Sequence, residues 1–132
     1  MKITLLSDDS VRFDADGDML TVEAQTADQS YSPFHMMASG LAVCTYSVLQ
    51  SWAQHAKLET DGLIIDVAWS FAEAPHRVGE YRVDITWPSL PPARAAAAER
   101  VAAMCPVKTT LLHAPAIHTR VAAGVTDPTG KP

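Results

Sequence analysis

With 132 residues, of which 48% are hydrophobic and 19% charged, the chain has the length and balance of one globular domain rather than of a disordered segment. Its formal net charge of −5 and its lack of a basic run argue against a nucleic-acid or anionic-membrane partner. We therefore expect a small molecule or a second copy of the chain as its partner.

The N-terminus and the cysteine content both predict a cytoplasmic protein. The first nine residues hold too short an apolar run, and too much acid, for a signal peptide. The longest mostly apolar stretch, residues 34–49, is interrupted by polar residues, so we expect no membrane span. Two cysteines 61 positions apart do not make the disulfide framework of a secreted domain.

The chain begins with two predicted strands, Lys2–Ser7 and Met19–Ala24. Between them, residues 14–17 (Asp-Ala-Asp-Gly) have the composition of a hairpin turn. Ser32 is a good N-cap and Pro33 is tolerated at the first helical position, so a helix is predicted from Pro33 to about Lys57.

The first half of this predicted helix is apolar almost all round, which is typical of a buried helix. A chain of this length can hardly cover both sides of such a helix by itself. We therefore expect two copies of the chain to form a dimer.

Alternating apolar residues predict a strand over Leu63–Ala72 and a returning strand over Glu80–Trp87, joined by a loop over 74–79. A helix rich in Ala, Glu and Arg is predicted over Ala93–Met104. The remaining predictions are a short helix from Cys105-Pro106 to about His113, a last strand over Ile117–Val121 and a loose tail over 126–132. All of these elements are assigned to one domain spanning residues 1–132.

The two cysteines are the best candidates for chemistry. Cys105 directly precedes Pro106, near a helix N-cap where free N–H groups favour a thiolate, and Lys108 follows within a turn. A small core residue at a helix junction would fit this position equally well. Cys44 lies in an apolar helix, where burial raises a thiol pKa, so its local pattern favours a structural cysteine.

The sequence around these cysteines resembles a known family. Ser32-Pro33 leading into Ala38–Thr45 (Ala-Ser-Gly-Leu-Ala-Val-Cys-Thr) is similar to the central-helix signature of the osmotically inducible protein C / organic hydroperoxide resistance (OsmC/Ohr) family. Cys105-Pro106-Val107 resembles the second cysteine motif of that family. The resemblance extends from about Met19 to Val121.

This resemblance implies an α+β, OsmC-like fold in which antiparallel sheets wrap around a long buried helix of an intertwined homodimer. It also implies a thiol peroxidase in which Cys44 attacks an organic hydroperoxide and Cys105 closes a disulfide, which an external dithiol reductant reopens. No cofactor and no metal are expected. Phe34, Met37 and Leu41, on the apolar helix near Cys44, are the candidate substrate-binding residues.

The chain departs from the family pattern at the residues that support the thiolate. Family peroxidases carry a glutamate just after the proline that begins the long helix, and here this residue is Phe34. That glutamate orients an arginine of the N-terminal hairpin, for which Arg12 is the candidate here, with Arg77 or a histidine as substitutes. A phenylalanine cannot orient an arginine by an ion pair, so the Cys44 thiolate should be less stabilised.

Two other functions remain open. The first is a dimer that binds a small apolar ligand near Cys44 without turning it over, which the substitution at Phe34 favours. The second is a thioesterase of hot-dog-like fold, which would need an acidic residue or Asn well placed on the helix, and the sequence shows none. The histidines are scattered without the spacing of zinc ligands, although His35 adjoins the position of the missing glutamate.

Overall fold

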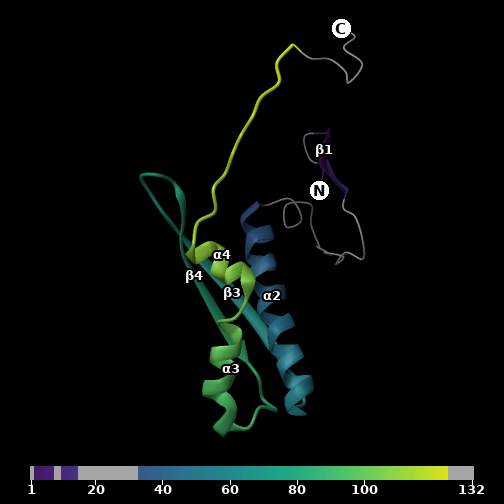
Figure 1. Cartoon of the computed structure of the whole chain (residues 1–132), viewed down its shortest axis with the longest axis vertical. Helices are drawn as coiled ribbons and strands as arrows, with labels where there is room; N and C mark the ends of the chain where they lie inside the picture. The colour runs from purple at the N-terminus through teal and green to yellow at the C-terminus, as the bar shows by residue number, and fades with distance from the viewer. Residues whose placement is uncertain (1, 8–9, 15–32, 125–132) are drawn as a thin grey trace.

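The computed structural model describes residues 2–7, 10–14 and 33–124, which form two antiparallel hairpins and four helical segments of an α+β chain. In chain order the elements are β1 (Lys2–Ser7), β2 (Ser10–Asp14), α2 (Pro33–Ala56), β3 (Ile64–Ala72), β4 (Arg77–Thr86), the 3-10 helix η1 (Pro92–Arg94), α3 (Ala95–Ala102) and α4 (Pro106–Leu112). Figure 1 shows the β3–β4 hairpin running beside α2, with α3 and α4 following it in the chain. No helix among the described residues is long and apolar enough to cross a membrane.

The first predicted strand is confirmed as β1, but its partner differs from the expected one. β1 pairs with β2 in a register that joins Lys2 to Asp14 and Thr4 to Arg12. The sequence analysis missed β2, since Ser10–Asp14 is short and polar in part. The predicted strand Met19–Ala24, the turn beyond Asp14 and the tail over 126–132 lie outside the described residues.

Helix α2 begins at Pro33 as predicted and ends at Ala56 in a left-handed cap. Lys57 has a φ of 55°, and the N–H of Leu58 donates to the carbonyl of Ala53 at 2.8 Å. This is the Schellman arrangement, in which the left-handed residue is most often glycine because a Cβ is disfavoured there.

Replacing Lys57 with glycine should therefore stabilise the protein. Relief of the left-handed strain is expected to raise the free energy of unfolding by about 1 kcal/mol. Chemical denaturation at fixed protein concentration measures this change. Lys57→Ala is the matched control, since it removes the same side chain but keeps the Cβ. A glycine variant no more stable than the alanine variant would contradict the argument.

One stripe of α2 packs against the remainder of the chain. The buried residues recur at helical spacing, Ala38, Leu41, Thr45, Leu49 and Ala53. The expected burial on all sides is not found within one chain, where four large apolar residues of α2 stay more than a third exposed, Met36, Met37, Val43 and Tyr46. The stripe faces β3, α3 and α4, which all contact α2.

The β3–β4 hairpin confirms the alternation read from the sequence. Ile65 pairs with Ile85 and Trp69 with Tyr81, and these side chains are partly buried while their strand neighbours are exposed. β4 begins at Arg77, three residues before its predicted start. The reason is a bulge after Ser70 in the register, which lets residues of the expected loop continue the pairing.

The buried core lies between the C-terminal half of α2, the end of the hairpin and α3. Leu49, Ala53, Trp87 and Ala98 form its centre. Trp87 is anchored at its polar edge, because its indole Nε1–H donates to the carbonyl of Glu59 at 2.8 Å. The core therefore fixes the second half of α2 on the hairpin and leaves the first half to shape the site.

The C-terminal region contains both a confirmed and an overturned prediction. The predicted helix 93–104 is present as η1 followed by α3, and the short helix after Cys105 is α4. The strand predicted over Ile117–Val121 is wrong. This segment has no regular structure, and Ile117 and Val121 are each 84% exposed. Figure 1 shows the chain after α4 extending away from the hairpin, and among the described residues no strand pairs with this segment.

Candidate functional site

The fold brings Cys44 and Cys105 together. The two thiols lie close enough to shift each other's pKa, although 61 positions separate them in the sequence. Both are free thiols, Cys44 partly exposed on α2 and Cys105 completely buried at the junction before α4. The sequence analysis could name each cysteine, but only the packing of α4 on α2 makes them a pair.

The local structure before α4 fixes the sulfur of Cys105. Its Sγ accepts a hydrogen bond from the backbone N–H of Lys108 at 3.5 Å, and its carbonyl accepts from the N–H of Thr109 at 3.1 Å. Pro106 occupies the first helical position, where it has no N–H to lose. The predicted N-cap position of Cys105 is confirmed.

The two thiols differ in acidity. Burial raises the pKa of Cys44, and the hydrogen bond with Cys105 raises it further, while a backbone hydrogen bond from Val107 acts in the opposite direction. Burial also acts to raise the pKa of Cys105, but the hydrogen bond from Cys44 opposes it. The contributions of Cys44, the Lys108 N–H and the Thr45 hydroxyl together lower the pKa of Cys105 below the ordinary value for a thiol.

This asymmetry predicts that the reduced protein loses its two thiol protons in separate steps. As the pH rises, Cys105 should ionise first because its pKa is lowered, and Cys44 should follow because its pKa is raised. The ultraviolet absorbance of the thiolate, followed across a pH titration, measures both steps. One step per chain should fall below the ordinary pKa of a cysteine thiol and one above it. A single joint step at the ordinary pKa would contradict the asymmetry.

Thr45 is a site residue that the sequence analysis missed. It is the one polar side chain in the buried stripe of α2, 3% exposed, and it follows Cys44 directly. Its hydroxyl donates to the carbonyl of Leu41 at 2.8 Å, and its presence near Cys105 acts to lower the pKa of that thiol. A threonine among apolar helix residues was the available signal, since a buried hydroxyl needs a partner.

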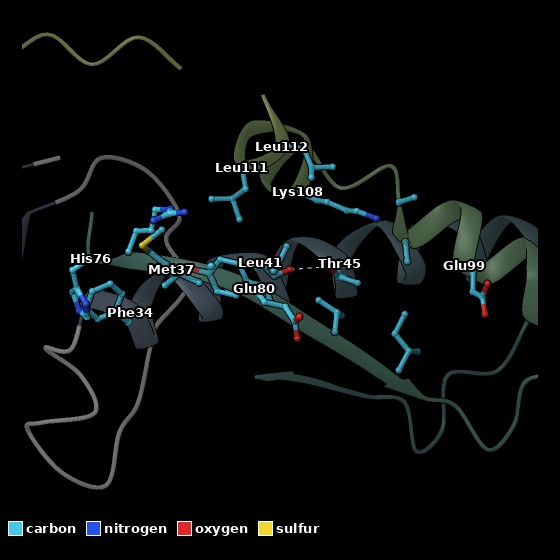
Figure 2. Close-up of a pocket in the computed structure, with 18 residues that line it drawn as sticks. Phe34, Met37, Leu41, Thr45, His76, Glu80, Glu99, Lys108, Leu111 and Leu112 are labelled. Atoms are coloured by element: carbon cyan, nitrogen blue, oxygen red, sulfur yellow. Dashed lines mark hydrogen bonds between the residues drawn. The ribbon is translucent and has the colours of Figure 1, made fainter. Parts of the chain in front are cut away.

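A groove of about 850 Å³ runs beside the cysteine pair, between α2, β4, α3 and α4. All three candidate substrate-binding residues, Phe34, Met37 and Leu41, line it. In Figure 2, Leu111 and Lys108 of α4 overhang the groove opposite Leu41 and Thr45 of α2. Its lining is mainly apolar and also includes the ionisable side chains of Arg77, Glu80 and Lys108, so it suits an amphipathic or apolar ligand.

The sequence model for the family described as OsmC-like protein matches residues 26–120. This chain belongs to the OsmC-like family. No curated protein matches its sequence.

Two solved structures share the OsmC-like fold of the chain. A candidate osmotic stress induced and detoxification response protein from Psychrobacter arcticus 273-4 is 26% identical with a TM-score of 0.56, over 61% of this chain and 59% of that one. An OsmC-like hydroperoxide resistance protein from Jannaschia sp. CCS1 is 24% identical with a TM-score of 0.55, over 80% of this chain and 74% of that one. The chain thus spans under two thirds of the first protein, and the second likeness shows the fold alone.

Phe34, which stands where OsmC-like peroxidases were expected to carry glutamate, forms an aromatic wall at one end of the groove. Its ring meets Phe71 edge-on with centroids 4.9 Å apart, and Phe71 stacks on His76, also at 4.9 Å. The ring therefore packs against the tip of the β3–β4 hairpin, in a position where an unpaired carboxylate would lose hydration.

The arginine expected to support the thiolate of this OsmC-like chain is not identified by the described contacts. The backbone of Arg12 lies in β2 opposite Thr4, and its side chain lies outside what the structure describes. Arg77 lines the groove, but its guanidinium donates to the carbonyls of Glu73 and Pro75 in the hairpin loop. The role of Arg12 stays a prediction.

Four of the five histidines of this OsmC-like chain have partners in the described structure. His35 packs edge-on against Trp69 at 5.0 Å, and His76 pairs with Glu73 at 2.8 Å. His55 and His113 each contact a backbone carbonyl one turn earlier in the chain. Among the described residues no three His, Cys, Asp or Glu side chains gather closely enough to hold a metal ion.

Proposed function

We propose that this OsmC-like protein is a thiol peroxidase that reduces organic hydroperoxides, with Cys44 as the attacking sulfur and Cys105 as the resolving sulfur. The proximity of the two thiols, each of which shifts the pKa of the other where α4 packs on α2, is the observation that carries the proposal, because a disulfide requires sulfurs already within reach of each other. The partial exposure of Cys44 and the complete burial of Cys105 favour this division of roles.

In the proposed reaction the sulfur of Cys44 attacks the terminal oxygen of the hydroperoxide. An S–O bond forms, the O–O bond breaks, and the organic fragment leaves as an alcohol after taking up a proton. Cys105 then attacks the sulfenic acid on Cys44, forming the S–S bond and releasing the oxygen as water. An external dithiol returns two electrons and restores both thiols.

The apolar groove supports an organic rather than an inorganic peroxide as the substrate. Met37 and Leu41 line it on α2, and Leu111 faces them from α4. Such walls stabilise a bound alkyl or aryl group by about 25 cal/mol per Å² of buried apolar surface. Hydrogen peroxide has no apolar surface to bury and would gain nothing from them.

The same proposal includes the homodimer. Large apolar side chains of α2 are exposed in the single chain, among them Met36, Val43 and Tyr46, and Ile117 and Val121 extend the exposed apolar surface beyond α4. A second copy covering them would account for a helix that is apolar on most sides. A reducing, cytoplasmic location fits a pair of free thiols.

The test is a count of thiols by mass spectrometry before and after one equivalent of cumene hydroperoxide. We expect the reduced protein to lose two hydrogens, and a peptide map to join Cys44 to Cys105. Hydrogen peroxide at the same concentration should react more slowly. Survival of both thiols over minutes of exposure would overturn the peroxidase proposal.

Binding of an apolar ligand without turnover is the second candidate. Phe34 in place of glutamate favours it, and so does the groove, whose lining includes Thr45 and Lys108 but neither cysteine. Calorimetry with decanoic acid tests this candidate. Leu111→Lys should weaken binding of decanoic acid because it places a charge in the groove. Ile117→Lys, outside the groove, is the control and should leave binding unchanged. This pattern, together with survival of both thiols in hydroperoxide, would support binding without turnover.

A further inference from the structure

The hydroxyl of Tyr81 is a buried polar group without a partner in the described structure. Tyr81 lies on β4 opposite Trp69 of β3, on the partly buried face of the hairpin. Trp69 in turn packs edge-on against His35 of α2, so this face is turned toward the helix. Among the residues that the structure describes, none makes a hydrogen bond with the Tyr81 hydroxyl, although its oxygen is closed off from solvent.

Such a hydroxyl is rare in a folded protein, because a buried tyrosine usually forms a hydrogen bond through its O–H. Leaving the group unpaired raises the free energy of the folded chain. Burial also raises the pKa of Tyr81, so the hydroxyl keeps its proton at neutral pH and is able to donate it. The unused group is therefore a hydrogen-bond donor that an incoming oxygen acceptor would satisfy.

Tyr81 also lines the groove, and it does so in the middle of the wall that β4 provides. The residues of β4 in this wall run from Arg77 to Ile85, with Tyr81 halfway between them. Val78 toward the hairpin tip and Val83 toward the opposite end give apolar walls on both sides of Tyr81. An oxygen atom that meets the hydroxyl from the groove would thus have apolar surroundings along the strand in both directions.

Resting on the groove as the ligand site of the proposed function, we propose that Tyr81 binds the ligand by donating a hydrogen bond to an oxygen that carries apolar groups on both sides. The ligand class is a chain with its oxygen acceptor in the interior, such as a secondary alkyl hydroperoxide or an internal ketone, rather than at the end. The ligand must displace the side chains that cover the hydroxyl, and the unmet hydrogen bond lowers the cost of this displacement. Met37 and Lys108, which border the groove in Figure 2, are long unbranched side chains that can change rotamer.

The first test compares two isomeric ketones, dibutyl ketone and heptyl methyl ketone, which carry the carbonyl in the middle and near the end of the same length of chain. Protein NMR titrations measure the dissociation constants, and neither ketone oxidises a thiol. The wild-type protein should bind dibutyl ketone about tenfold more tightly, the effect of one hydrogen bond. Tyr81→Phe should abolish this preference. Tyr46→Phe is the matched control and should keep it, because Tyr46 lies on α2 outside the groove.

The second test is the stability of the free protein in urea. Tyr81→Phe removes the unpaired hydroxyl and keeps the ring, so its unfolding midpoint should equal or exceed that of the wild type. A lower midpoint would show that the hydroxyl already has a partner, and the proposal would then be wrong. Equal affinities of the wild type for the two ketones, a preference that persists in Tyr81→Phe, or no binding of either ketone would contradict it as well. The thiol count with cumene hydroperoxide is a separate measurement, so loss of the peroxidase function would leave the ketone results unchanged.

Discussion

Replacing Cys44 with serine is expected to lower the rate of organic hydroperoxide reduction by at least about a hundredfold, because a serine hydroxyl cannot be oxidised and is a weak nucleophile at neutral pH. Serine keeps a hydrogen-bond donor near Cys105, so the fold should be retained. The measurement is consumption of cumene hydroperoxide in the presence of dithiothreitol.

Cys105→Ser separates this effect from a general loss of structure. That variant keeps the proposed attacking sulfur and should trap a sulfenic acid on Cys44, detectable as a dimedone adduct, without forming an internal disulfide. Hydroperoxide consumption by Cys44→Ser at the wild-type rate would exclude Cys44 as the attacking residue. Adduct formation in Cys44→Ser rather than in Cys105→Ser would show that the two sulfurs have the opposite roles.

Replacing Leu49 with alanine is expected to lower the free energy of unfolding by about 3 kcal/mol, the usual cost of a cavity left by a buried leucine. Leu49 is 0% exposed and lies at the centre of the core formed with Ala53, Trp87 and Ala98. Urea denaturation at constant protein concentration measures the change, since a dimer would make the midpoint depend on concentration.

Leu112→Ala is the control for Leu49→Ala, because Leu112 is 69% exposed and the same change there removes little packing. It should lower the free energy of unfolding by no more than about 0.5 kcal/mol. Equal losses in the two variants would mean that the core does not lie where the described contacts place it.

Short-range patterns carried most of what could be predicted about the fold. Ser32-Pro33 gave the start of α2, and alternating apolar residues gave β3 and most of β4, because N-caps and period-two burial are local properties. The start of β4 could not be placed, since a bulge depends on both strands of a pair. The strand expected over 117–121 fails for a related reason, because a strand needs a neighbour that its own residues do not specify.

In the candidate site, too, local patterns could be predicted and contacts between elements could not. The motifs around Cys44 and Cys105 identified both residues, but their proximity follows from the packing of α4 on α2, which no spacing rule predicts. The lowered pKa of Cys105 depends in part on Thr45, a donor from another element. Phe34 was recognised as a departure from the family pattern, whereas its packing on Phe71 required the structure.

The placement of the two cysteines also affects how strongly the folded chain resists unfolding and proteolysis. A disulfide between Cys44 and Cys105 would enclose β3, β4 and α3 in one covalent ring. Closing a ring of this size lowers the entropy of the unfolded chain enough to stabilise the folded state by about 4 kcal/mol in the chain-entropy description. The oxidised form would therefore survive heat and protease longer than the reduced form, while the segment after Leu112 stays outside the ring and equally open to cleavage in both.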